Sequence, residues 1–80
     1  MIVIDDYNEG VIHAGKEKYD MKKVSAIMWD EVDKLEPNNT EHNPRHKNDG
    51  VNDFYVFYMD EKDLFKYMTD RNATNYIVGV

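Results

Sequence analysis

The sequence predicts a small α+β domain: a mainly antiparallel sheet of three to four strands with two helices packed on one face, in the order ββα-loop-βαβ. Three observations predict this class. Runs of β-branched and aromatic residues alternate with turn residues, as is typical of strands. A stripe of hydrophobic residues at spacings of three and four indicates a helix. The length of 80 residues suits a single domain, which we expect to span residues 1–80.

The expected elements begin with a β-hairpin. Residues 2–4 are Ile-Val-Ile, a β-branched run that favours a buried strand. Residues 8–10, Asn-Glu-Gly, have the composition of a turn. Residues 11–14 then return as a second strand, which Gly15 ends.

A helix is expected between Asp20 and Pro37. Asp20 is a good N-cap residue, and Pro37 stops the helix. The stripe on its hydrophobic face comprises Met21, Val24, Ile27, Met28, Val32 and Leu35. Trp29 lies at the edge of this stripe, and Asp30 and Asp33 share the face roughly opposite to it.

Residues 37–52 are expected to form a long polar loop, because they hold both prolines and show no periodicity. His42 and His46 are four residues apart there, a spacing that places two metal ligands on one face of a helix. Pro44 lies between them and disfavours a regular helix, and zinc needs three or four ligands in a defined geometry. We therefore expect a solvated loop and no metal site.

The second half of the chain is expected to add a strand, a short helix and a strand. Residues 53–59 are aromatic and β-branched on both faces, which predicts an interior strand. Asp60 caps the helix, with Asp63 at its third position. The inward-facing residues would be Leu64, Phe65 and Met68. After a loop at residues 72–75, residues 76–80 form the last strand.

Composition and charge exclude several classes of protein. The absence of Cys excludes disulfides and thiolate metal sites and fits a reducing cytosol. No hydrophobic run approaches the roughly 20 residues that span a bilayer. The hydrophobic run at the N-terminus is too short for a signal peptide. The formal net charge of −6 disfavours direct binding to nucleic acid or anionic lipid. We expect a complete, soluble, cytoplasmic protein.

The clustering of acids is the main functional signal, with sixteen Asp and Glu against ten Lys and Arg. The three groups are Asp5, Asp6 and Glu9; Asp30, Glu31, Asp33 and Glu36; and Asp49, Asp53, Asp60, Glu61 and Asp63. Acids at a helix start are stabilised by the helix dipole, which explains those from Asp60 onwards as ordinary surface. The second group falls in the last half of the first helix, where the dipole disfavours anions. Its position therefore suggests a binding role.

In size and charge pattern the whole chain resembles the small acidic DNA-mimic proteins that bacteriophages make early in infection. The resemblance depends on Asp5-Asp6, Asp30-Glu31-x-Asp33-x-x-Glu36 and Asp60-Glu61-x-Asp63. It implies an inhibitor that occupies the DNA-binding surface of a basic host protein, with an HU-like nucleoid protein as one expected target. The expected partner-binding residues are Asp30, Glu31, Asp33, Glu36, Asp60, Glu61 and Asp63, with Trp29 and Tyr58 as anchors.

The alternative function is a general protein-interaction module or a homodimeric adaptor. The strand at residues 53–59 would then expose a Tyr-rich patch on one face, since Tyr favours interface centres. The strand at residues 76–80 would pair with its twin if it lies at a sheet edge. We expect neither an enzyme nor a cofactor, because the sequence has no Cys nucleophile, no Gly-rich phosphate loop and no recognisable Ser–His spacing.

Overall fold

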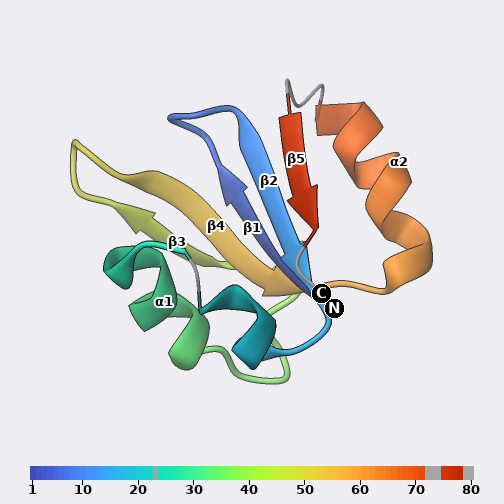
Figure 1. The fold of residues 1–80 in the computed structure, drawn as a ribbon, viewed down its shortest axis with the longest axis horizontal. Helices are drawn as coiled ribbons and strands as arrows, with labels where there is room; N and C mark the ends of the chain where they lie inside the picture. The colour runs from blue at the N-terminus through green and yellow to red at the C-terminus, as the bar shows by residue number, and fades with distance from the viewer. Residues whose placement is uncertain (23, 72–74, 79–80) are drawn as a thin grey trace.

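The computed structural model describes residues 1–22, 24–71 and 75–78, of which Tyr19 and residues 75–78 are described by their backbone alone. It contains a five-stranded sheet in the order β3-β4-β1-β2-β5 (Figure 1). The strands are β1 (Ile2–Asp6), β2 (Val11–Gly15), β3 (Arg45–Asn48), β4 (Asp53–Tyr58) and β5 (Asn75–Val78). The helices are the short 3-10 helix η1 (Lys18–Met21) and the α-helices α1 (Ala26–Asp33) and α2 (Glu61–Arg71).

The predicted α+β class and the mainly antiparallel sheet are confirmed. Strands β3, β4, β1 and β2 form three antiparallel pairs, and β5 adds to β2 in parallel. β1 lies in the middle of the sheet, where Ile4 pairs with His13 of β2 on one side and Val56 of β4 on the other. The predicted hairpin, interior strand and last strand are therefore all present, the last as β5.

The two α-helices pack on opposite faces of the sheet, so the prediction that both cover one face was wrong. The reason lies in β1, which is buried and hydrophobic on both of its faces. The cluster on the α1 face contains Ile2, Ile4, Met21, Val32, Leu35, Phe54 and Val56. The cluster on the α2 face contains Val3, Ile12, Ala14, Phe57, Met59 and Leu64.

The predicted first helix is interrupted, because η1 ends at Met21 and α1 begins after Ser25. The Ser25 hydroxyl accepts a hydrogen bond from the Met28 amide at 3.4 Å, which makes Ser25 the N-cap. Asp20 was wrongly predicted as the cap of this helix. Its carboxylate instead accepts the Glu17 amide at 3.0 Å beside η1.

The hydrophobic stripe nevertheless identified the residues that face the sheet. Met21, Val32 and Leu35 are buried, and the partly buried Val24 and Met28 pack against the same cluster. Ile27 is the exception among the stripe residues, with 42% exposure.

The predicted loop at residues 37–52 contains a strand. β3 pairs with β4, with Arg45 opposite Val56 and Asn48 opposite Asp53. Its sequence is Arg-His-Lys-Asn, so it has no hydrophobic pattern by which it could be predicted. Charged and polar residues are usual on an edge strand, where they discourage pairing with other chains.

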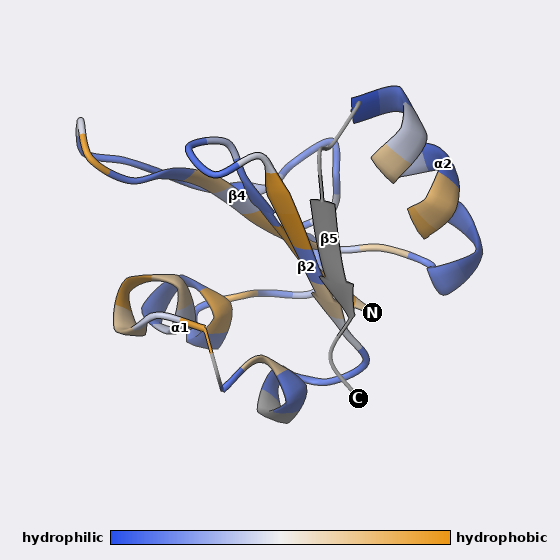
Figure 2. Cartoon of the chain, turned by 45° about the horizontal axis from the view of Figure 1, so that its top comes forward, coloured by the Kyte–Doolittle hydropathy of each residue, from blue (hydrophilic) through white to orange (hydrophobic). Residues whose placement is uncertain are grey.

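α2 confirms the predicted second helix, but its inward face differs from the prediction. Leu64 is buried and Met68 is half-buried against the cluster on the α2 face. Phe65 is 77% exposed, because it directly follows Leu64 and so projects about 100° away from it. Figure 2 shows hydrophobic and hydrophilic stretches alternating along α2. Residues 72–74 of the predicted loop, and residues 79–80, lie outside the described residues.

Candidate protein-binding surfaces

Neighbouring cations engage two of the predicted contact acids of α1. Asp30 Oδ2 lies 2.7 Å from Lys34 Nζ, and the hydrogen bond from Lys34 lowers the pKa of Asp30. Glu31 is only 9% exposed, and its Oε2 accepts hydrogen bonds from Arg45 at 2.8 and 3.1 Å. Glu31, one of the predicted partner contacts, is thus largely buried and bonded to Arg45 of β3, a strand that was not predicted.

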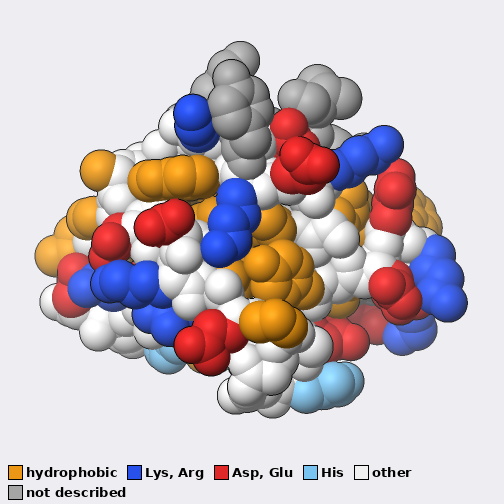
Figure 3. Space-filling view, turned by 90° about the horizontal axis from the view of Figure 1, so that it is seen from below, with side chains coloured by type: hydrophobic (Ala, Val, Ile, Leu, Met, Phe, Trp, Pro, Cys, Tyr) orange, Lys and Arg blue, Asp and Glu red, His pale blue; other side chains and the backbone are white. Residues whose placement is uncertain are grey.

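Asp33 and Glu36, at and beyond the end of α1, are exposed and make no ion pair with a described residue. The ammonium of Lys18 donates to the backbone carbonyl of Asp33 at 3.2 Å, so a cation is close by. Figure 3 shows acidic, basic and hydrophobic side chains interspersed on the underside of the molecule, where α1 lies. The acids of α1 therefore do not form a separate acidic row.

The acids at the start of α2 are better placed to meet a partner. Asp60, Glu61 and Asp63 are exposed and make no ion pair with a residue that the structure describes. The dipole of α2 stabilises their negative charge without neutralising it. Asp60 and Asp63 line a cleft of about 420 Å³. The other lining residues are Met1, Thr40, Glu41, His42, Tyr58 and Met59.

A second cleft, of about 290 Å³, continues along α2 and shares Glu41, Met59 and Asp63 with the first. It adds Tyr67, Lys66 and Asp70, the last two forming an ion pair at 2.7 Å. We call the two clefts together the α2 groove. Glu41 was absent from the predicted contacts, since no pattern in the sequence places residue 41 beside residue 63.

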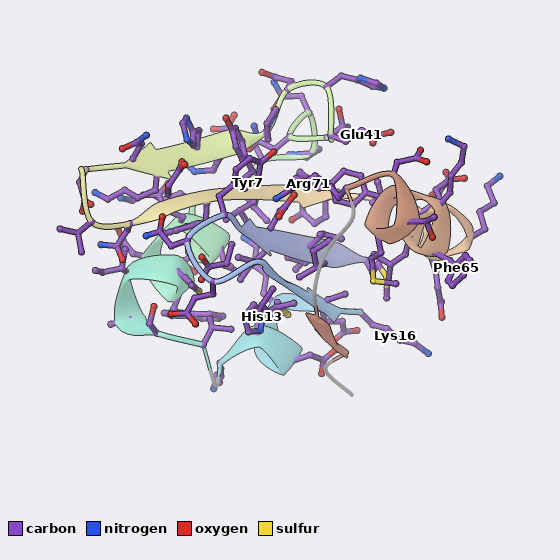
Figure 4. The ribbon with its side chains drawn as sticks, turned by 90° about the horizontal axis from the view of Figure 1, so that it is seen from above. Tyr7, His13, Lys16, Glu41, Phe65 and Arg71 are labelled. Atoms are coloured by element: carbon purple, nitrogen blue, oxygen red, sulfur yellow. The ribbon has the colours of Figure 1, made fainter. Side chains whose placement is uncertain are left out.

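The two predicted aromatic anchors are only partly accessible. Trp29 and Tyr58 are half-buried and pack against the cluster on the α1 face. Tyr58 also lines the α2 groove. Phe65 is the more exposed ring, and Figure 4 shows it pointing outward from α2. Phe65 was predicted to face the core and was therefore not among the predicted anchors.

Asp5, which belongs to the first of the three acidic groups in the sequence, is only 1% exposed. Its carboxylate accepts hydrogen bonds from Tyr67 Oη at 2.5 Å and from Arg71 at 2.7 and 3.1 Å. Burial, and then the hydrogen bond with Asp5, raises the pKa of Tyr67. The hydrogen bonds with Asp5 raise the pKa of Arg71. Asp5 thus joins β1 to α2 and is not a surface acid.

Aromatic side chains lie next to Asp5 on the same side of the sheet. The Arg71 guanidinium lies 3.9 Å from the centre of the Tyr7 ring, and the two residues are adjacent in Figure 4. Tyr7 contacts Tyr55 at 5.0 Å between ring centres, and Tyr55 stacks on His46 at 4.1 Å. Burial raises the pKa of Tyr7, although Arg71 opposes the shift. We call Tyr7, His46, Tyr55 and Arg71 the aromatic patch.

The described residues include no group of three or more His, Asp or Glu side chains that could hold a metal ion. His42 lines the α2 groove, whereas His46 belongs to the aromatic patch and lies 2.7 Å from Asp53 Oδ1. None of the helices in the described part of the chain has the length and hydrophobicity needed to cross a membrane. No family model, curated protein or solved structure matches this chain.

Proposed function

We propose that this chain is an acidic binding protein that accepts a basic protein in the α2 groove. The main support is that Glu41, Asp60 and Asp63 line one groove and make no ion pair within 4.0 Å with a Lys or Arg that the structure describes. Lys66 of the same groove pairs with Asp70 at 2.7 Å and acts on Glu41 and Asp63 only at longer range. The formal net charge of −6 adds a negative field around them, which attracts basic partners from a distance.

The finer form of the proposal is a DNA mimic, as the resemblance implies. The DNA-binding surface of a protein presents Lys and Arg to phosphates. The carboxylates of the α2 groove and of the neighbouring Glu61 take the place of those phosphates. An HU-like nucleoid protein is the first target to test. Such binding is fast, because complementary charge accelerates the encounter. It weakens with salt, because dissolved ions screen the attraction between the charges.

Phe65 supplies a hydrophobic contact to this interface. It is 77% exposed, and Glu61 and Thr69 lie one turn before and one turn after it on the same face of α2. Aromatic residues surrounded by polar ones often contribute most of the binding energy of an interface. A partner that follows α2 therefore meets both carboxylates and an aromatic ring.

The proposal is tested by capture from a nuclease-treated bacterial lysate on the tagged full chain, with elution along a salt gradient. The expected result is a basic DNA-binding protein that elutes between about 0.2 and 0.5 M salt, where screening is strong. The captured protein is then titrated with DNA in the presence of the chain, because a mimic competes with DNA directly. A neutral partner that resists salt would contradict the proposal.

Two double variants with the same change in net charge separate the groove from the overall charge. Asp60→Asn with Asp63→Asn is expected to weaken capture at least about tenfold, since close charge pairs contribute about 1.5 kcal/mol or more each. Glu17→Gln with Asp30→Asn alters exposed acids outside the α2 groove and is expected to change capture less than about twofold. Equal losses in both variants would show that net charge alone is responsible.

The aromatic patch favours a second candidate, a protein-interaction module whose binding depends little on salt. Arg71 is neutralised by Asp5, and His46 lies against Asp53, so the patch presents rings with compensated charges. β5 lies at the sheet edge, where a second copy could pair. Under this function Tyr7→Ala abolishes capture and the Asp60 and Asp63 variants do not. Sedimentation at increasing protein concentration would reveal a homodimer.

A further inference from the structure

A buried carboxylate at the far end of β1 belongs to neither the α2 groove nor the aromatic patch. Asp6 is the last residue of β1 and is 5% exposed. Two adjoining hollows, of about 360 and 220 Å³, share Asp6, Glu9, Ser25 and Met28 as lining residues. We call the two hollows the Asp6 cleft. None of the residues that line it lines the α2 groove.

One oxygen of Asp6 is satisfied within the fold and the other is not. Oδ1 accepts the Glu9 amide at 3.1 Å, whereas Oδ2 accepts no hydrogen bond from a described residue. Among the described residues, no fully buried side-chain oxygen or nitrogen lacks a partner. Asp6 Oδ2 therefore reaches the open space of the cleft. A charge in so buried a side chain is costly unless a partner compensates it.

The walls of the cleft contain no compensating cation, since none of the described lining residues is Lys or Arg. Glu9 and Asp53 add further carboxylates. The N-terminal turn of α1 brings positive partial charge, but the Met28 amide there already donates to Ser25 Oγ at 3.4 Å. His13 lines the same cleft, and in Figure 4 it lies on the side of the sheet that faces α1.

Hydrophobic surface completes the cleft. Val11, Val24 and Met28 line the larger hollow, and Phe54 lines the smaller one. A wall of this kind, next to a carboxylate, suits the methylenes of a long side chain that ends in a cation. A hydrogen bond between such a cation and a carboxylate is about twice as strong as a neutral one.

We propose that the Asp6 cleft binds the side chain of a Lys or Arg from a basic partner, with the cationic group donating to Asp6 Oδ2 and the methylenes on Val11 and Met28. The inference depends on the proposed function only for the source of the cation. The site itself is separate from the α2 groove, so each can fail without the other.

The test is an NMR titration of the ¹⁵N-labelled full chain with n-butylammonium and n-butylguanidinium, which reproduce the ends of Lys and Arg. The expected result is saturable shifts, in the millimolar range, at the amides of residues 6–11 and 25–28. Acetate and n-pentanol, matched probes of opposite and of no charge, are expected to cause no saturable shift there. The proposal is overturned if neither cation causes saturable shifts at these amides, or if n-pentanol causes shifts of the same size.

Two variants locate the binding. Asp6→Asn keeps an oxygen for the Glu9 amide and is expected to weaken cation binding at least about tenfold. Glu9→Lys alters an exposed residue and places a competing ammonium at the cleft, so it is expected to abolish probe binding. This variant tests the site independently of Asp6→Asn, which changes a buried residue. Asp60→Asn with Asp63→Asn is expected to bind the probes normally. Unchanged affinity in the Glu9→Lys variant contradicts the site.

Discussion

Asp5 and Asp6 are neighbouring acids with different surroundings, because successive residues of a strand point to opposite faces of the sheet. Asp5 lies on the α2 side, where Tyr67 and Arg71 satisfy both of its oxygens. Asp6 lies on the α1 side, where one of its oxygens is open to the cleft that Ser25, the N-cap of α1, also lines. The sequence groups the two carboxylates in one acidic cluster, and the pleat of β1 separates them.

Removal of the Asp5 carboxylate tests its role in holding α2 to the sheet. Asp5→Ala is expected to lower the free energy of unfolding by about 3 kcal/mol, since it leaves the partly buried Arg71 without its counter-ion. Urea unfolding followed by circular dichroism measures the change. Asp70→Asn removes the exposed ion pair with Lys66 and is expected to leave the midpoint unchanged. A similar small effect of both variants would contradict a structural role for Asp5.

Asp49 gives the turn between β3 and β4 a dependence on pH. Hydrogen bonds from the amides of Asn52 and Val51, at 2.7 and 3.0 Å, lower the pKa of Asp49 to about 2. Because this pKa lies below the ordinary Asp value, the stabilisation is complete above about pH 4 and is lost as the pH falls towards 2.

An NMR titration of the Asp49 carboxyl carbon measures this pKa directly. The expected midpoint is about 2, and Asp49→Asn should reduce the loss of stability between pH 4 and 2. A midpoint for Asp49 near 4 would mean that the turn hydrogen bonds do not form in solution.

At the level of helices and strands, hydrophobic spacing identified the buried face of the first helical segment but not its break. Met21 and Val32 are both buried, although η1 and α1 are separate helices. At the break, the Ser25 hydroxyl accepts a hydrogen bond from the Met28 amide and caps α1. The spacing of hydrophobic residues does not indicate a local hydrogen bond of this kind. β3 escaped prediction for a related reason: its polar residues pair with β4 through the backbone, which leaves no side-chain pattern.

The N-cap of α1 is open to a direct test. Ser25→Ala is expected to reduce the free energy of unfolding by about 1 kcal/mol, because the Met28 amide loses its acceptor. The effect matters for α1, which has only 8 residues and depends on its cap and its packing. Urea unfolding measures the loss, and Ser25→Asn, another good N-cap that adds no charge beside Asp6, is expected to retain the stability. Equal stability of all three proteins would contradict the cap.

At the scale of the whole molecule, two hydrophobic clusters formed by the described residues share β1. Ile4 belongs to the cluster on the α1 face and Val3 to the cluster on the α2 face. Neither helix can detach without exposing one face of the central strand to water. We therefore expect the two faces to unfold together in a single transition.

Leu64→Ala tests this coupling from the α2 face. The substitution empties a buried position and is expected to lower the free energy of unfolding by about 2–5 kcal/mol. Trp29, which packs against the other cluster, reports the α1 face by fluorescence. The fluorescence midpoint and the circular dichroism midpoint are expected to move together. A shift in circular dichroism with an unchanged fluorescence midpoint would mean that the two faces unfold independently.

The candidate site could be predicted only in part, because its residues come from segments far apart in the sequence. The exposed acids Asp60 and Asp63 follow from local helix signals. Glu41 reaches the same groove because Thr40 forms a bridge with Tyr58 at the end of β4. Similarly, the buried Glu31 is paired by Arg45 across a strand that has no hydrophobic pattern. Such tertiary contacts require the topology, which spacing along the chain does not contain.

The position of β1 has a consequence for how the protein is made. It is the first strand of the sequence and the middle strand of the sheet, and its partner β4 begins only at Asp53. At the usual rates of translation β4 follows several seconds after β1. During that interval the nascent hairpin of β1 and β2 presents two hydrophobic faces and an unpaired edge. Ribosome stalling before β4 would therefore leave a nascent chain that is prone to aggregate and to bind chaperones.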